Sequence, residues 1–213
     1  MFKPALITSI FLVLTLLLKA QNTLPTLIAD LPQTRYFDWG KPPIVDPEGP
    51  GEPWVHPHNM CHTIYNNCVA SNTLAPQGKN NYAVSNLSDD NPKTAWVEGQ
   101  DDYGIGAYLE FTNFIIYGSE LHILNGYQSS QTSWENNSRV KKLKVSCDGK
   151  ELCILELGDV MGIQTFTFND MILEKINPNQ TGKEKTIRFT IMDVYPGIKW
   201  KDTAITEIFM CGG

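Results

Sequence analysis

Oxygen-bearing side chains gather in one short stretch of the sequence, NLSDDNPKTAWVEG at residues 86–99. Asp89, Asp90 and Asn91 stand directly before Pro92 in this stretch. Calcium and other hard cations prefer clustered carboxylate, amide and backbone carbonyl oxygens. The spacing is not that of an EF-hand, and a proline-containing turn held by Asx hydrogen bonds explains the same residues equally well. The stretch is therefore a candidate cation site, with an ordinary turn as the alternative.

A second polar segment, residues 125–143, combines aromatic rings with amides and a guanidinium group. Its Tyr127, Trp134 and Arg139 are suited to a sugar, because a ring stacks on the apolar face and polar groups bond the hydroxyls. The alternative is a polar surface loop that binds nothing. We predict these three residues as ligand contacts at one end of the fold.

Two other clusters are weaker candidates for chemistry. HPHNMCH at residues 56–62 resembles a metal cluster, but its spacing fits no zinc motif and Cys61 is expected to be oxidised, which favours a polar linker end. The carboxylates of Glu98, Asp101, Asp102 and Glu110 could serve a hydrolase, yet carboxylates adjacent in sequence are usually solvated. No G-x-S-x-G or HExxH motif is present, so we predict no catalytic residues.

The N-terminus predicts export. Lys3 precedes an apolar run at residues 5–18, and a small residue, Ala20, marks the expected cleavage site of a signal peptide covering residues 1–20. The run is shorter than a membrane span requires. Cleavage removes two lysines and changes the formal charge of the chain from −6 to −8. An acidic chain without a basic block disfavours nucleic acid as a partner, so we expect a secreted or cell-surface protein with no membrane span.

The five cysteines of an exported chain suggest disulfides. Cys147 and Cys153 flank an Asp-Gly turn, so a bridge across that hairpin is one expectation. Cys211 could pair with Cys61 or with Cys68, and the sequence does not choose between them.

The chain divides into a proline-rich arm and one β-rich domain that must position the candidate sites. Residues 21–60 hold eight of the thirteen prolines and predict an extended linker or wrapping arm, whereas residues 61–213 predict the folded domain. Within that domain, Ile187, Phe189 and Ile191 alternate with polar residues, as expected of a strand. Similar segments occupy 108–111, 120–124, 140–147, 153–157, 164–168, 186–194 and 203–210, which together predict an all-β antiparallel sandwich or barrel.

Three strings carry a family resemblance: ASNTLAPQGKNNYAVSNLSDDNPKTAWVEGQDDYGIGAYLEF (70–111), ILNGYQSSQTSWENNSRVKKLKV (123–145) and IMDVYPGIKWKDTAITEI (191–208). Over roughly residues 68–211 the chain resembles the NADase-type glycan-binding domain, a bacterial discoidin-like module of the factor five/eight C-type. The resemblance implies an antiparallel β-sandwich of jelly-roll, galactose-binding-domain-like type. It implies a noncatalytic module that binds a glycan or cell-surface carbohydrate, since NADase activity resides in a separate domain that this chain has no room for.

The resemblance also implies a structural calcium ion. Its ligands would be Asp89, Asn91, Thr94 and Glu207, with Asp90 replacing the glycine that is common in related loops. Because discoidin-like modules also bind proteins, a protein-interaction or adhesion module is the alternative function, and a hydrolase is a third. Within residues 192–208, we expect YPGIKWKD to be the turn of a hairpin joining the last two strands, with its charged residues solvated.

Overall fold

The structure, a computed structural model, describes residues 23–31, 61–62, 67–89, 91–112, 119–176 and 185–211. For Cys61, His62 and Cys211 it describes the backbone alone. The predicted signal peptide, Asp90 and most of the arm lie outside these residues, as do the side chains of the histidine-rich stretch.

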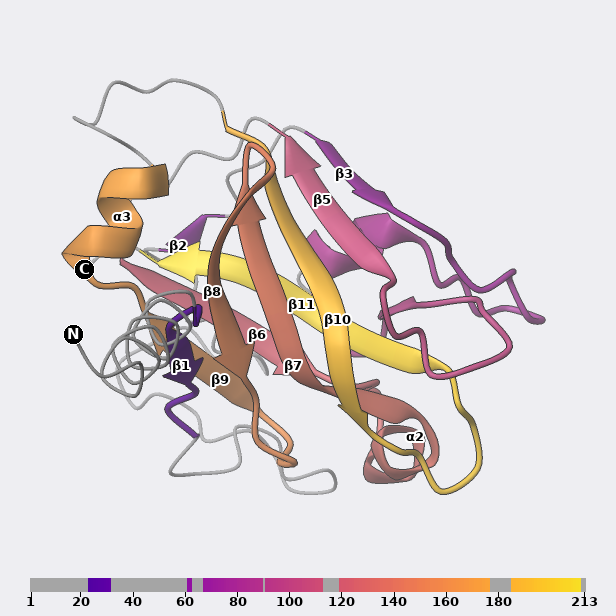
Figure 1. The fold of residues 1–213 in the computed structure, drawn as a ribbon. Helices are drawn as coiled ribbons and strands as arrows, with labels where there is room; N and C mark the ends of the chain where they lie inside the picture. Colours follow the sequence, from indigo (N-terminus) through magenta and orange to yellow (C-terminus); the bar gives the residue numbers. More distant parts are fainter. Residues whose placement is uncertain are drawn as a thin grey trace, which may run out of the picture.

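Strands dominate the described residues, as the sequence predicts (Figure 1). They are β1 (Thr26–Ile28), β2 (Cys61–His62), β3 (Asn67–Ala70), β4 (Trp96–Val97), β5 (Tyr108–Thr112), β6 (Glu120–Asn125), β7 (Ser138–Cys147), β8 (Lys150–Glu156), β9 (Ile163–Thr167), β10 (Ile187–Tyr195) and β11 (Thr203–Cys211). Short helices accompany them: the 3-10 helix η2 (Val84–Ser88), α2 (Gln131–Asn136) and α3 (Asp170–Ile176). All seven segments expected as strands from their alternation are strands.

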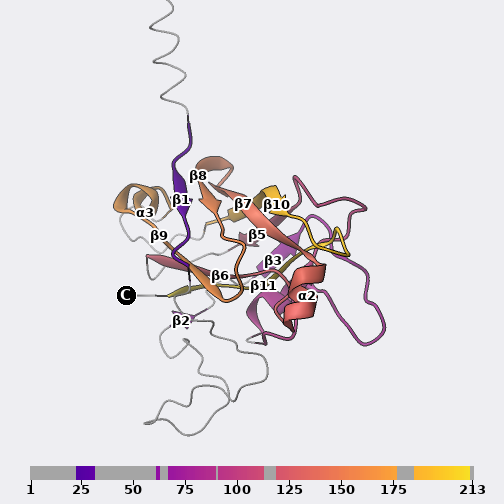
Figure 2. The same ribbon diagram turned by 90° about the horizontal axis from the view of Figure 1, so that it is seen from below.

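The strands form two facing layers (Figure 2). Hydrogen bonding orders one layer β3-β5-β10-β7-β8, and the other contains β11, β6 and β9, with β2 and β4 also paired to β11. The alternating apolar residues of each layer fill the space between them: Phe189 and Ile191 from β10, Leu143 from β7, and Ile123 and Ile208 from the other layer are at most 2% exposed. Burial of these side chains is the main force holding the layers together.

The turn between β7 and β8 forms as predicted. Asp148 and Gly149 both have positive φ, at 47° and 77°, which is the backbone of the tight hairpin turn that Asp-Gly sequences favour. The antiparallel register then pairs Val145, and not Cys147, with Cys153.

The last two strands do not form the hairpin that the sequence suggested, and that expectation is wrong. β10 pairs with β5 and β7, whereas β11 pairs with β2, β4, β6 and, over two residues, with β7. The segment between them therefore carries the chain from one layer to the other. β7 is hydrogen-bonded to both strands and lies between them in the strand order, so β10 and β11 do not pair with each other.

The described part of the arm is built into the sandwich. β1 runs parallel to β8, pairing Thr26 with Ile154 and Ile28 with Glu156. Just beyond it, Asp30 forms a two-way backbone bridge with Thr165 of β9 in the other layer. One short segment thus joins the edges of both layers.

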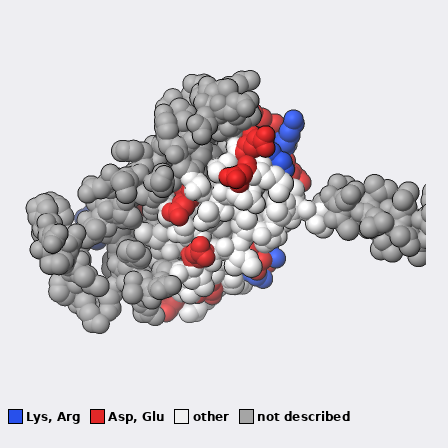
Figure 3. Space-filling model, turned by 90° about the vertical axis from the view of Figure 1, so that its left-hand side faces the viewer, with Lys and Arg blue, Asp and Glu red and all other residues white. Residues whose placement is uncertain are grey.

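Neither α2 nor α3 approaches the length of a bilayer span, and no helix in the described part of the chain does so. Over the face at the left of Figure 1, the described surface is mainly uncharged, with separate acidic side chains and basic ones near the margins (Figure 3).

Candidate functional site

A pocket of about 430 Å³ opens between the end of β4, the start of β11 and helix α2. Its apolar and aromatic lining comes from Leu74, Tyr82, Val97, Tyr127 and Trp200. Its polar lining comes from Gln77, Asn80, Ser133, Asn136, Asn137 and Asp202. Aromatic rings beside several amides are the usual composition of a site for a small polar ligand.

Two tyrosines form one wall of this pocket. The rings of Tyr82 and Tyr127 meet edge to face with centroids 6.3 Å apart, and both pack against a small cluster containing Val97 and Ala204. Burial raises the pKa of Tyr127, and the neighbouring Tyr82 adds to the rise, so its hydroxyl remains a neutral hydrogen-bonding group. The wall is rigid because its rings are held by packing.

The segment between β10 and β11 also lines the pocket and is hydrogen-bonded to α2. The backbone N–H groups of Ile198 and Trp200 donate to the carbonyls of Glu135 (2.9 Å) and Asn136 (2.8 Å). A Cβ atom on Gly197 would lie 2.4 Å from the Asn136 carbonyl oxygen, so this close approach requires glycine. Trp200 is consequently held at the pocket while its side chain remains 47% exposed.

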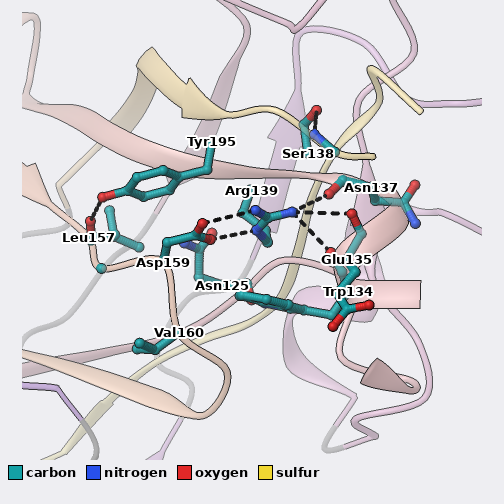
Figure 4. Close-up of polar contacts among 12 residues, drawn as sticks. Asn125, Trp134, Glu135, Asn137, Ser138, Arg139, Leu157, Asp159, Val160 and Tyr195 are labelled. Atoms are coloured by element: carbon teal, nitrogen blue, oxygen red, sulfur yellow. Dashed lines mark hydrogen bonds and ion pairs between the residues drawn. The ribbon is translucent and has the colours of Figure 1, made fainter. Parts of the chain in front are cut away.

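Helix α2 owes its position to Arg139, which lies beneath it and is 6% exposed (Figure 4). Its Nε and Nη2 atoms donate to the two carboxylate oxygens of Asp159 at 2.7 and 3.1 Å. Its Nη1 atom donates to the carbonyls of Trp134 (3.2 Å) and Asn137 (2.9 Å). The guanidinium also lies 4.4 Å from the centroid of the Trp134 ring, whose Nε1–H donates to the carbonyl of Asn125.

The three predicted ligand contacts therefore separate in the structure. Tyr127 lines the pocket, whereas Trp134 and Arg139 do not. Arg139 directs its donors at protein acceptors, and the half-buried Trp134 shares that network, so within this pocket the two side chains support the lining without forming part of it. Four further lining residues, Trp200, Asn136, Asn137 and Asp202, are not predicted as ligand contacts from the sequence, although the position of Trp200 between two lysines in a turn indicates an exposed ring.

The four predicted calcium ligands do come together. The backbone N–H of Asn91 lies 3.0 Å from Asp89 Oδ1 and 3.1 Å from Glu207 Oε1, so it is shared by the two carboxylates. The Thr94 hydroxyl donates to Asp89 Oδ2 at 2.7 Å. Glu207 is 3% exposed on β11, so its carboxylate faces the loop. No group of three or more Asp, Glu, His or Cys side chains arranged for a metal occurs among the described residues, so any further ligands would have to be amide, hydroxyl or carbonyl oxygens.

The sequence of this domain matches a known protein family over most of its length. The sequence model for the NAD glycohydrolase translocation F5/8 type C domain matches residues 59–211. The chain belongs to this family.

Solved structures agree on the fold of this F5/8 type C domain. A structure of the CBM32-1 and CBM32-2 domains of Clostridium perfringens ZmpB in complex with GalNAc superimposes with a TM-score of 0.54 at 10% identity, covering 89% of this chain and 40% of that one. CBM32-3 from a family 31 glycoside hydrolase of the same organism gives 0.46 at 16% identity, covering 73% of this chain and 92% of that one. The comparison with curated proteins gives no match. The family match and the first of these structures, with a TM-score above 0.5, confirm the expected discoidin-like β-sandwich.

The carboxylates considered for hydrolysis lie apart from the pocket of the F5/8 type C domain. Glu98 is fully buried beneath the loop 99–104, Asp101 and Asp102 are exposed on that loop, and Glu110 pairs with Arg188 at 2.6 Å. Glu98 Oε2 accepts a hydrogen bond from the Gln100 backbone N–H (3.0 Å), and its Oε1 atom has no partner. Burial, followed by Asp102 and Asp202, raises the pKa of Glu98 to about 7, against the opposing effect of the Gln100 N–H.

The cysteines of the F5/8 type C domain with described side chains are free thiols. Cys147 and Cys153 are both unbridged, so the expected bond across the β7–β8 hairpin is absent, consistent with a register that places Val145 opposite Cys153. Cys68 is also free, and burial raises the pKa of the Cys68 and Cys153 thiols to about 12, which makes them poor nucleophiles. Cys61 and Cys211 are direct partners in the antiparallel register of β2 and β11.

Proposed function

We propose that this F5/8 type C domain is a noncatalytic module that binds carbohydrate in the pocket between Tyr127 and Trp200. The observation that carries the proposal is the composition of the pocket: three aromatic rings line it together with several amides and one carboxylate. A sugar has an apolar face that packs on a ring and a rim of hydroxyls that need donors and acceptors. The glycan complex of the CBM32 neighbour supports the same ligand class.

The pocket lining offers each kind of contact that a sugar requires. Asn136 and Asn137 lie at the end of α2, and their amides can both donate and accept hydrogen bonds. Trp200 and Tyr127 come from different segments of the chain. Backbone hydrogen bonds hold the segment of Trp200, and packing holds the Tyr127 ring, so both are in place before a ligand binds. Such a preformed site loses little conformational entropy on binding.

A glycan array followed by titration calorimetry with the best sugar tests the proposal. Trp200→Ala should weaken binding by about tenfold, because an aromatic contact of this kind contributes on the order of 1 kcal/mol beyond its buried area. Ile198→Ala is the matched control, since Ile198 lies in the same segment and does not line the pocket. An array without any sugar ligand, or equal effects of the two substitutions, would contradict the proposal.

The second candidate function is a protein-interaction module. Ile198 is 79% exposed beside Trp200, and two exposed apolar side chains on one turn are a feature of protein-binding surfaces. Pull-down of a protein partner that resists competing sugars and is lost with Ile198→Ala would favour this function over carbohydrate binding.

The absence of catalysis is part of the same proposal. Among the described residues that line the pocket, Asp202 is the one carboxylate, whereas a typical glycosidase uses two opposed carboxyl groups. Incubation with aryl glycosides and with NAD should give no turnover above buffer. Turnover lost with Asp202→Asn would instead establish a hydrolase.

We also propose a structural calcium ion held by Asp89, Asn91, Thr94 and Glu207. The donor set fits, because Asp89, Thr94 and Glu207 bring carboxylate and hydroxyl oxygens together around the Asn91 backbone, and these are oxygen types that calcium binds. Calcium bound here would neutralise the two carboxylates and fasten the loop to β11.

Thermal unfolding with added calcium or with EDTA tests this site. Calcium should raise the melting temperature, by an amount equivalent to about 2.7 kcal/mol at a hundredfold excess over the dissociation constant. Glu207→Gln should abolish the rise, whereas Glu174→Gln on the exposed surface of α3 should preserve it. A melting temperature that does not respond to calcium in the unmodified protein would refute the site.

Finally, we propose that the module is exported from a bacterial cell after removal of residues 1–20. N-terminal sequencing of the protein recovered from culture medium should begin at Gln21. Recovery of the full-length chain from the cell interior alone would contradict export.

A further inference from the structure

The charge of the pocket comes from a single residue. Of the described residues that line it, Asp202 is the only one whose side chain is ionised at neutral pH. The other polar lining groups are amides and hydroxyls, which serve anionic and cationic ligands equally well. Any discrimination by ligand charge within the lining therefore falls to Asp202.

The backbone holds Asp202 in a fixed position. Its carbonyl accepts from the Ser138 N–H at 2.9 Å at the start of β7, and the adjacent Thr203 hydroxyl donates to the carbonyl of Tyr103 at 2.9 Å. The side chain is partly buried. Burial raises the pKa of Asp202, and Asp101 adds to the rise, but an aspartate starts so far below neutrality that the carboxyl remains ionised.

Other acidic residues near Asp202 add to the negative charge of this region. Asp101 acts electrostatically on Asp202, and Asp102 and Asp202 both act on Glu98, so other carboxyl groups lie near Asp202. Two lysines lie near this region: Lys199 Nζ is 4.5 Å from the centroid of the Trp200 ring, which lines the pocket, and Lys201 Nζ is 6.0 Å from that of Tyr103. Both lysines are exposed and neither lines the pocket, so solvent screens their charge more strongly than that of Asp202.

We propose that Asp202 determines specificity by ligand charge, so that the pocket accepts neutral and amine-bearing sugars and rejects carboxylated or sulfated ones. This inference rests on the proposed carbohydrate-binding function. The carboxylate accepts hydrogen bonds from sugar hydroxyls and pairs with an ammonium group, whereas it repels a second anion brought into the same pocket.

The size of the effect follows from the separation expected inside a pocket of this volume. Two unit charges about 5 Å apart change affinity by roughly fourfold in a fully aqueous dielectric and by roughly fifteenfold at half that dielectric constant. Because a partly buried carboxylate lies between these conditions, an amine and an acid of the same sugar should differ by tenfold or more in dissociation constant.

Titrations with galactose, galactosamine and galacturonic acid, and with the matching glucose series, test the inference on the full chain. The unmodified protein should bind the amine at least as well as the neutral sugar and the acid at least tenfold less tightly than the amine. Asp202→Asn should reduce this ratio to about threefold or less. Asp170→Asn is the matched control, since it removes the same charge from an exposed position at the start of α3, outside the pocket lining, and it should change the ratio by less than twofold.

The possible results distinguish the role of Asp202 from carbohydrate binding itself. Binding of neutral sugar with an amine-to-acid ratio that Asp202→Asn leaves unchanged would overturn the role of Asp202 and retain carbohydrate binding. An unmodified protein that binds none of the sugars would overturn both. Should Asp202→Asn not fold, the unmodified protein still decides the matter, because high salt must narrow its amine-to-acid ratio if charge is responsible.

Discussion

Replacing Glu98 by glutamine should remove a pH dependence from the stability of the domain. Glu98 is fully buried, its Oε1 atom has no partner, and a Cβ atom on Gly104 would lie 2.6 Å from its Cδ. The loop thus closes tightly over a carboxyl group that the fold favours in its neutral form. Glutamine has nearly the same shape as the protonated acid and cannot ionise.

The magnitude follows from the change in pKa between the unfolded and folded chains. The folded environment raises the pKa of Glu98 from 4.5 to about 7. At 1.36 kcal/mol for each pKa unit, ionisation of Glu98 lowers the free energy of unfolding by about 3 kcal/mol at most. Water near the exposed loop reduces this loss to about 2 kcal/mol. Because the folded pKa is raised, the free energy of unfolding falls as pH increases from 4.5 to 7 and stays low above 7.

Urea unfolding followed by tryptophan fluorescence measures this effect from about pH 5 to about pH 8. The advantage in unfolding free energy of Glu98→Gln over the unmodified protein should grow by about 2 kcal/mol across that range. Glu174→Gln, on the surface of α3, controls for loss of one negative charge and should show no such growth. Parallel pH profiles for the unmodified protein and Glu98→Gln would refute the argument.

Three further outcomes are expected. Arg139→Met should lower the unfolding free energy by about 1–3 kcal/mol in urea titrations, because the carbonyls of Trp134 and Asn137 and the exposed carboxylate of Asp159 lose their donor, and no measurable loss would contradict that role. Gly197→Ala should lower the melting temperature and weaken sugar binding together, since its Cβ would displace the segment from the Asn136 carbonyl; unchanged binding would separate the segment from the pocket. Peptide mapping without reductant should find Cys61 linked to Cys211, whose backbones are opposite in register, and a link to any other cysteine would contradict this.

The strands were predictable because their information is local. Alternation with a period of two is visible in a segment such as 187–191, and the buried positions of β10 are the ones that the pattern indicated. Which strands pair is not local: the assumption that consecutive strands form a hairpin held for β7 and β8, where Asp-Gly fixes the turn, and failed for β10 and β11.

The site was predictable to a smaller extent for the same reason. Asp89 and Glu207 were placed together because the family resemblance supplied their long-range relationship. Nothing local in the sequence indicates that Arg139 is buried, because an arginine in a polar segment looks the same whether its donors meet water or carbonyl groups. Trp200 enters the pocket through contacts of its segment with α2, which the sequence does not encode locally.

The position of β1 has a consequence for how this domain can be excised. The family match begins at residue 59, yet β1 lies upstream of it and covers the free edge of β8. A fragment starting at the family boundary would expose the unpaired backbone groups of β8 and remove the link to β9. Such an edge is a template for pairing with another molecule, so the short fragment would be prone to self-association while the chain that retains residues 23–31 would resist it. We therefore expect the stable folding unit to extend beyond the segment that matches the family by a strand that is distant in sequence.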